Sequence, residues 1–207
     1  MDRAIITIEK IEKHYGPERV LGPLSLSVRG GEIVGIVGAN GAGKSTLLRI
    51  LAFAESPDSG SLKFEHIDVD ETGYVPQELA LYESLTGRQN LKYWATAAGI
   101  FGKQRRIRIR YLLEKVNLTD KADKPVSSYS GGMKRRLNLA CALVGNVKLL
   151  LLDEPTVGAD AASVELILDA VHELAERGCA VLLVSHHSDE IKRLCTRTVE
   201  LRKGRIE

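Results

Sequence analysis

Short apolar runs alternate with amphipathic segments along much of this 207-residue chain. Runs with few polar side chains occupy residues 32–37, 147–152 and 179–184. Such runs predict strands that are buried on both faces of a parallel sheet. Apolar positions spaced as on one helix face follow these runs, at residues 47–51, 161–177 and about 188–195. The repeated order of strand and helix predicts an α/β fold with a parallel sheet.

The N-terminal part of the chain has a different pattern. Residues 4–9 and 24–28 predict strands of a separate β portion, joined through the turn signal Gly16-Pro17. Residues 61–75 predict another pair of strands. We therefore expect an N-terminal antiparallel β subdomain beside the parallel sheet.

Helical periodicity dominates the middle of the sequence, over residues 84–118. This stretch separates the two blocks in which strands and helices alternate. At 207 residues the chain fits one domain better than two. We expect a single domain spanning residues 1–207, with a helical subdomain at about 78–140 inserted into its core.

Composition and charge narrow the functional classes. The chain has 29 basic and 27 acidic residues, a formal net charge of +2, so no overall basic field predicts a nucleic acid partner. Cys141, Cys179 and Cys195 are scattered, which predicts neither a disulfide framework nor a zinc site and is typical of a reducing cytosol. The apolar runs are too short to span a bilayer, so we expect any membrane contact to be indirect.

A glycine-rich loop between the first apolar run and its helix matches the pattern G-x-x-x-x-G-K-[ST]. Glycines let the backbone N–H groups approach phosphate oxygens, and the N-terminus of the helix attracts anions. The lysine adds a charge for the β and γ phosphates, and the serine hydroxyl suits Mg²⁺. A glycine-rich turn that binds nothing is the alternative, which the flanking strand and helix disfavour. The loop comprises Gly38, Ala39, Asn40, Gly41, Ala42, Gly43, Lys44, Ser45 and Thr46.

Two carboxylates follow the apolar run Leu149 to Leu152. Ligands bind at the carboxyl ends of strands in open α/β sheets, which is where Asp153 and Glu154 are expected. Asp153 is placed to hold Mg²⁺, and Glu154 is placed to polarise a water for attack on a γ-phosphate. Two ordinary surface acids are the alternative, and the phosphate loop in the same chain disfavours it.

A third motif is the segment YSGGM, which contains Ser130, Gly131 and Gly132. Ser130 can cap a helix whose first turn contains both glycines, so backbone N–H groups stay available to an anion. In isolation the segment is equally a simple junction between a loop and a helix. Nothing in the motif itself brings it to the phosphate loop of the same chain.

The order of GANGAGKST, Gln77, YSGGM, LLLLDEP and His186 resembles the ATP-binding subunit of ABC transporters over essentially the whole chain. The resemblance implies a P-loop NTPase core of the RecA-like type, with an N-terminal antiparallel β subdomain and an inserted α-helical subdomain. It also implies hydrolysis of ATP with Mg²⁺, coupled to transport through a separate transmembrane permease. Such a subunit is cytoplasmic and peripheral on the inner face of the membrane.

The resemblance implies roles for single residues. Tyr15 matches the aromatic residue that stacks on adenine, and Gln77 matches the glutamine that touches Mg²⁺ and the attacking water. His186 matches the histidine that contacts the γ-phosphate; together with Lys44, Gln77 and Glu154 it completes the expected catalytic set. Ser130 to Gly132 match the signature that binds the γ-phosphate held by a second ATP-binding subunit, identical or not. Asp160 matches a dimer-interface aspartate, although it is equally placed to cap the next helix.

Three questions stay open in the sequence. The first question is the function of the ATPase. The sequence YSGGMKRRLNLA resembles exporter ATPases, and the main alternative is a soluble ABC ATPase that acts on ribosomes or DNA. By analogy, the segment from Gln77 to about Trp94 is where the permease docks. The basic segment 103–110 is either a solvated helix face or a contact for anionic lipid headgroups, with nucleic acid a weaker third.

Overall fold

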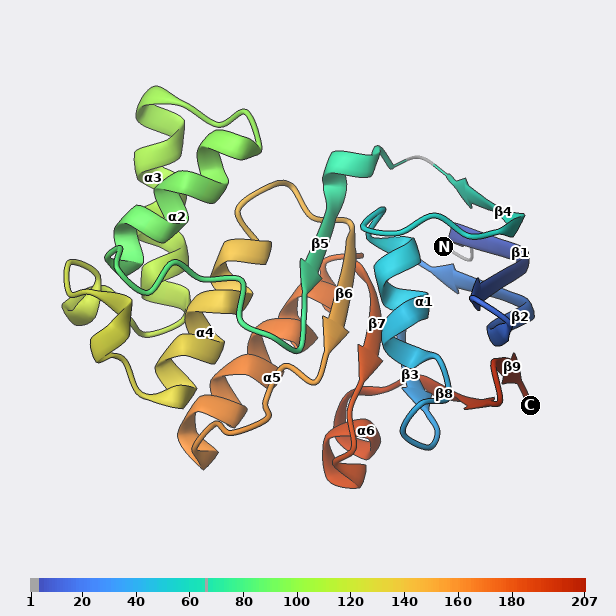
Figure 1. Ribbon diagram of the computed structural model, residues 1–207. Coiled ribbons are helices and arrows are strands. Elements are labelled where there is room, and N and C mark those ends of the chain that lie inside the picture. Colours follow the sequence, from blue (N-terminus) through green and yellow to red (C-terminus); the bar gives the residue numbers. More distant parts are fainter. Residues whose placement is uncertain (1–3, 66) are drawn as a thin grey trace.

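The computed structural model describes residues 4–65 and 67–207, and these residues form two sheets with helices packed around them (Figure 1). The larger sheet has six strands in the order β5-β6-β7-β3-β8-β9. Their bounds are β3 (Ile33–Val37), β5 (Thr72–Val75), β6 (Leu149–Asp153), β7 (Ala180–Val184), β8 (Arg197–Arg202) and β9 (Arg205–Ile206). The strands from β5 to β8 run parallel, and β9 pairs antiparallel with β8.

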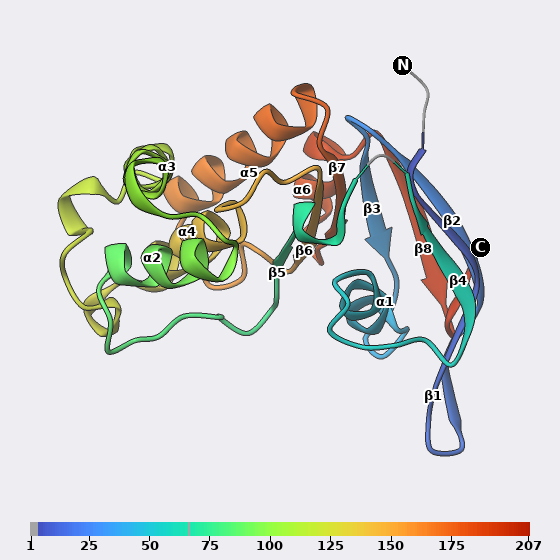
Figure 2. The ribbon, with the colours of Figure 1, turned by 90° about the horizontal axis from the view of Figure 1, so that it is seen from above.

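The smaller sheet is antiparallel and has the order β2-β1-β4 within the described residues. Its strands are β1 (Ala4–Tyr15), β2 (Glu18–Arg29) and β4 (Ser59–Phe64). Buried and exposed residues alternate along most of β2, because only one face of this sheet is covered. Figure 2 shows the small sheet at one side of the molecule, with helix α1 (Lys44–Leu51) between it and the larger sheet.

Three helices lie on the opposite side of the larger sheet from the small sheet (Figure 1). They are α2 (Gly87–Ala97), α3 (Gly102–Lys115) and α4 (Gly131–Ala142), all from the helical middle of the chain. Helix α2 begins with a reciprocal capping box, in which Thr86 and Gln89 each bond the other's backbone N–H. Helices α5 (Ala161–Glu176) and α6 (Ser188–Leu194) follow β6 and β7.

Two apolar clusters cover the two faces of the larger sheet. Along β6, Leu150 and Leu152 belong to the cluster that includes α4 and α5, whereas Leu149 and Leu151 belong to the cluster that includes α1. Side chains alternate between faces in a strand, so a strand covered on both faces must be apolar throughout. This packing explains the unbroken apolar runs and fixes the carboxyl ends of β3, β6 and β7 at one edge.

Most sequence-based element predictions are confirmed, including the strand before the phosphate loop, the helix after it and the helices at 161–177 and 188–195. The two strands predicted within residues 61–75 are present as β4 and β5. They do not pair with each other, because β4 pairs with β1 and β5 pairs with β6. Strand β8 was not predicted, although it lies beside β3 and supports the phosphate loop. Its polar residues alternate with Val199 and Leu201, a short pattern that is hard to separate from a loop. The boundaries 78–140 of a helical subdomain stay a prediction.

Candidate functional site

The glycine-rich loop connects β3 to α1 and needs glycine at its ends for steric reasons. Gly38 has φ of 148°, and a Cβ there would lie 2.2 Å from the carbonyl oxygen of Leu201 on β8. Gly43 has φ of 100°, and a Cβ there would lie 2.6 Å from the Leu21 side chain. Gly43 is the N-cap of α1 and has no side chain with which to occupy the first backbone N–H groups. Those groups are available to an anion.

Lys44 is buried at the start of α1, with 7% of its surface exposed. Its ammonium donates to the carbonyl oxygens of Gly38, at 2.8 Å, and Ala39, at 3.0 Å. These bonds hold the positive charge of Lys44 over the phosphate loop. A phosphate bound by the loop would therefore meet a cation already in place.

A cavity of about 410 Å³ opens beside this loop. It brings together residues from β2, the phosphate loop, α1, the segment after β5, the end of β6, the end of β7 and the segment after β7. The lining residues are Val20, Asn40, Gly41, Gly43, Lys44, Ser45, Thr46, Gln77, Asp153, Glu154, Val184 and His186. The expected catalytic and metal residues thus meet in one cavity, as the shared edge of the parallel strands requires.

Asp153 ends β6 and is 2% exposed. Burial raises the pKa of its carboxyl, while a hydrogen bond from the Ser45 hydroxyl and the Lys44 charge act in the opposite direction. Its Oδ1 atom has no hydrogen-bond partner among the described residues. A buried, unpartnered carboxylate oxygen beside a hydroxyl is a suitable donor set for a hard divalent cation.

Glu154 follows immediately and adopts a left-handed backbone conformation with φ of 52°, which is uncommon outside glycine. Its Oε1 lies 3.1 Å from Nε2 of His186, without hydrogen-bond geometry, and its Oε2 accepts the His186 backbone N–H at 3.4 Å. Burial raises the pKa of the Glu154 carboxyl, and the His186 charge opposes that shift. A carboxylate with a raised pKa is a stronger base toward a bound water.

Gln77 lines the cavity, and a contact that the sequence did not predict holds its backbone. Arg135 on α4 donates from Nη1 to the carbonyl of Gln77, at 2.6 Å, and from Nε to the carbonyl of Val157, at 2.9 Å. One guanidinium therefore ties α4 to the segments after β5 and β6. The run of three basic residues at 134–136 was the available signal, and a basic run gives no indication of which carbonyls it will meet.

Ser130, Gly131 and Gly132 are not among the residues that line the cavity. Ser130 is the N-cap of α4, where its hydroxyl accepts the Met133 backbone N–H at 3.2 Å. A Cβ at Gly132 would lie 2.3 Å from a carboxylate oxygen of Asp160, so this glycine is also needed for packing inside the chain. Asp160 itself caps α5 by accepting the Ser163 N–H at 2.9 Å, as one of the two readings predicted.

Tyr15 is likewise not among the cavity residues, and its side chain is held by other contacts. Its hydroxyl donates to Glu55, at 2.7 Å, and accepts from Arg49, at 2.8 Å. Arg49 also reaches the Thr46 hydroxyl at 3.4 Å, so Tyr15 is connected to the phosphate loop through one side chain. With 43% of its surface exposed, the tyrosine is partly accessible to a ligand, and the Lys13 ammonium lies 5.8 Å from the centre of its ring.

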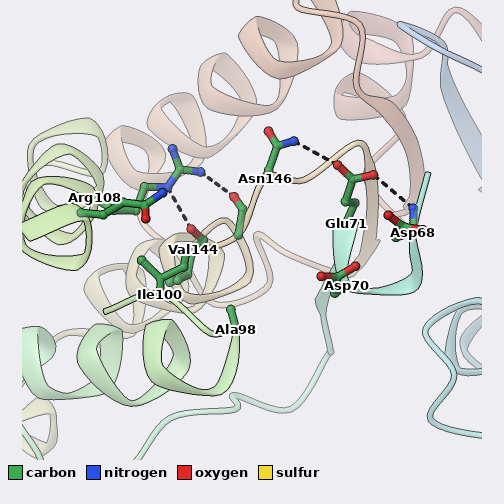
Figure 3. Close-up of a pocket in the computed structure, with 10 residues that line it drawn as sticks. Asp68, Asp70, Glu71, Ala98, Ile100, Arg108, Val144 and Asn146 are labelled. Carbon is green, nitrogen blue, oxygen red and sulfur yellow. Dashed lines mark hydrogen bonds between the residues drawn. The ribbon is translucent and has the colours of Figure 1, made fainter. Parts of the chain in front are cut away.

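A separate cleft of about 540 Å³ lies between α3 and the segments that precede β5 and β6 (Figure 3). It contains no residue of the predicted site in the described chain. Arg108 projects toward it and donates to the carbonyls of Leu143, Val144 and Gly145. Arg108 is therefore held by backbone carbonyls, whereas Lys103, Arg106 and Arg110 are exposed and the interpretations of the basic segment 103–110 stay predictions.

Comparison with known families shows that the chain belongs to the ABC transporter family, which matches residues 21–157. It is an ATP-binding, ATP-hydrolysing domain of this family, and its fold is that of the family's P-loop ATPases. The fold class expected from the sequence is confirmed.

Three curated relatives illustrate the similarity. The chain is 37% identical to the linearmycin resistance ATP-binding protein LnrL of Bacillus subtilis (strain 168), covering 98% of this chain and 68% of that protein. It is 39% identical to the Nod factor export ATP-binding protein I of Paraburkholderia xenovorans (strain LB400), covering 99% and 70%. It is 38% identical to the probable multidrug ABC transporter ATP-binding protein YbhF of Escherichia coli (strain K12), covering 100% of this chain but 37% of that protein.

Two solved structures have closely similar folds. One is an ATP-binding subunit of an ABC transporter, with a TM-score of 0.88 and 27% identity over 98% of this chain and 88% of that one. The other is the ATP-binding cassette MJ0796, a dimer in a post-hydrolysis state bound to ADP and Pi, with a TM-score of 0.87 and 26% identity over 98% and 96%. In the described residues of our chain, no helix is long and apolar enough to cross a membrane.

Proposed function

We propose that this ATPase powers the export of a substrate through a separate transmembrane permease and works as one half of an ATP-bound dimer. The relatives named above include proteins of export and of drug resistance, which supports the outward direction. The chain would then lie at the cytoplasmic face of the membrane and contact the membrane indirectly.

Within one chain, the cavity residues have different roles in the proposed hydrolysis. The backbone N–H groups of the loop and the Lys44 ammonium hold the phosphates, where they balance negative charge that spreads over the γ-phosphate oxygens. Glu154 orients a water and accepts its proton as the water attacks. His186, 3.1 Å from Glu154, contacts the γ-phosphate, and Gln77 senses the attacking water. In the proposed arrangement Tyr15 stacks on adenine.

Mg²⁺ fits the donor set that the chain offers. The Ser45 hydroxyl, the Gln77 side-chain oxygen and the unpartnered Oδ1 of Asp153 would hold it, and these hard oxygen ligands suit magnesium. No cluster of three or more His, Cys, Asp or Glu side chains forms a metal site among the described residues. That agrees with a metal held partly by nucleotide and water. When bound, Mg²⁺ neutralises charge on the phosphates.

One observation carries the proposal of a dimer: the phosphate loop lies in the cavity, whereas Ser130 to Gly132 line no part of it. Ser130 stands at an exposed helix N-terminus, where a phosphate from another molecule can approach. A solved relative of very similar fold is a dimer. Two head-to-tail chains would place each signature over the nucleotide of the other chain.

The test of this proposal is the variant Glu154→Gln. We expect it to bind ATP, hydrolyse it at least about a hundredfold more slowly than wild type, and accumulate dimers, because removing the base leaves binding intact. Light scattering with ATP and Mg²⁺ measures the dimers, and the wild type without ATP is the control. A Glu154→Gln variant that stays monomeric at high protein and ATP concentrations would contradict the dimer.

A second experiment addresses the permease. Purification of the native protein from membranes in mild detergent should recover a polytopic membrane protein in constant ratio to the chain. Recovery with ribosomes or DNA would instead favour the soluble ABC ATPase that the sequence left as the main rival. Identifying the membrane protein would also identify the class of substrate.

A further inference from the structure

A buried carboxylate outside the expected catalytic set lies directly behind the site. Glu190 on α6 is 7% exposed, and within residues 4–65 and 67–207 no lysine, arginine or histidine forms an ion pair with it. A buried carboxylate needs hydrogen-bond donors to offset its lost hydration. Its two oxygens are each satisfied by one buried hydroxyl.

The two hydroxyls come from different segments of the site. Thr156 donates to Oε1 of Glu190 at 2.7 Å, and Ser185 donates to Oε2 at 2.8 Å. Both residues are buried, with 3% and 5% of their surfaces exposed. The Ser185 oxygen also accepts the backbone N–H of His187 at 3.0 Å. One carboxylate therefore binds the segment after β6 to the segment after β7.

These contacts surround the two residues that are expected to act on the γ-phosphate and the water. Thr156 stands two residues after Glu154, and Ser185 and His187 flank His186 on both sides. Glu154 also holds a strained left-handed backbone conformation, which persists only where the surrounding structure fixes it. The 3.1 Å approach of Glu154 to His186 therefore joins the same two segments that the Glu190 carboxylate holds together.

We infer that Glu190 is a positioning residue for ATP hydrolysis: through Thr156 and Ser185 it holds the Glu154 carboxylate and His186 in register across the cavity. The inference rests on the proposed function of Glu154 and His186. It also assigns a role to Ser185, whose hydroxyl is one of the two donors to Glu190. A threonine at this position would carry the same hydroxyl, so Ser185→Thr should be neutral for this network.

The experiment compares Glu190→Gln, Ser185→Ala and Thr156→Val with wild type in steady-state ATP hydrolysis. We expect kcat to fall by about tenfold or more in Glu190→Gln and by less in the other two, because small displacements of reacting groups slow chemistry strongly. The KM for ATP should change less than about twofold, since the phosphate loop is untouched. The conservative variants Ser185→Thr and Thr156→Ser should keep nearly wild-type kcat.

The matched control is Glu165→Gln. Glu165 is an exposed carboxylate that also anchors α6, through two bonds of 2.7 Å to Arg193, but it does not touch the network. The Glu165→Gln variant should leave kcat unchanged. An equal fall of kcat in Glu165→Gln and Glu190→Gln would reduce the role of Glu190 to holding α6 in place and would overturn the inference.

The double variant Ser185→Ala/Glu190→Gln tests whether the residues act as a unit. Its kcat should be no lower than that of the worse single variant, because the same network is already broken. If Glu190→Gln fails to fold by circular dichroism, Ser185→Ala and Thr156→Val decide, and unchanged kcat in both overturns the inference. A wild-type chain that hydrolyses no ATP would instead refute the proposed function.

Discussion

Helices α1 and α4 both have glycines at their N-termini, but the surroundings of the two N-termini differ. Each starts at glycines, so backbone N–H groups of the first turn can meet an anion. At α1 the loop, Lys44, Ser45 and the carboxylates of two further residues line one cavity. At α4 the Ser130 hydroxyl occupies the Met133 N–H, and Gly132 packs against Asp160.

The difference shows that a helix N-terminus is a site only when other elements converge on it. The α1 site gathers a cation, a hydroxyl and two carboxylates from one chain, which are the groups of the proposed nucleotide site. The α4 end offers backbone N–H groups and a serine, but it lies outside the cavity that contains the phosphate loop. In the proposed dimer, a second molecule supplies the phosphate at this end.

The largest effect is expected at the α1 site. Lys44→Ala should lower the rate of phosphate release by at least about a hundredfold, since the γ-phosphate loses a cation that the loop carbonyls hold in place. A coupled assay at saturating ATP measures the rate. Lys63→Ala, which removes an exposed lysine of β4, is the control. Turnover close to wild type in Lys44→Ala would refute the assignment of the cavity.

A smaller effect, of a different kind, is expected at α4. Ser130→Asp keeps a good N-cap, so the fold should be as stable as wild type, but it places a negative charge where the partner's phosphate would lie. We expect ATP to bind each monomer normally while hydrolysis falls by about tenfold and ATP-driven dimers weaken. Fluorescent nucleotide binding and light scattering separate the two effects.

The control for that prediction is Ser130→Asn, a neutral residue that caps a helix equally well. It should lose much less activity than Ser130→Asp. Reduced ATP binding by the monomeric Ser130→Asp variant would mean that α4 faces the nucleotide of its own chain. The contrast between the two helix starts would then be wrong.

The sequence sufficed for the phosphate loop and the buried strands because both patterns are local. Gly38 to Thr46 and Leu149 to Glu154 are contiguous, and their neighbours specify the strand and helix around them. The remaining features depend on contacts between distant segments. Arg135 meets Gln77 across 58 residues and Thr156 meets Glu190 across 34, and no spacing rule in one sequence predicts such pairs.

The basic segment 103–110 illustrates the same limit. Its charges are alike in the sequence, yet Arg108 turns inward to three carbonyl oxygens and Arg105 donates to Thr96. Lys103, Arg106 and Arg110 stay exposed. Which cation points inward depends on the orientation of α3 against α4, and that orientation comes from packing.

The smallest effect is a pH dependence of stability with opposite signs in the two regions. Burial raises the native pKa of Glu154, so its contribution to stability is full below the ordinary pKa of 4.5 and is lost as pH rises through the native value. Hydrogen bonds from Ser163 lower the native pKa of Asp160, so its contribution is present above the ordinary value of 3.8 and is lost as pH falls through the native one.

Glu154→Gln should therefore raise the melting temperature of the nucleotide-free protein by a few degrees near neutral pH, because a neutral amide replaces a buried charge. The gain should shrink as the pH falls through the raised native pKa toward 4.5, because the wild-type carboxyl binds its proton over this range. Asp160→Ala should lower the melting temperature near neutral pH and lose that effect in acid. Melting curves across pH measure both variants. Parallel pH dependences in the two would mean that the α1 cavity and the α4 end do not differ electrostatically.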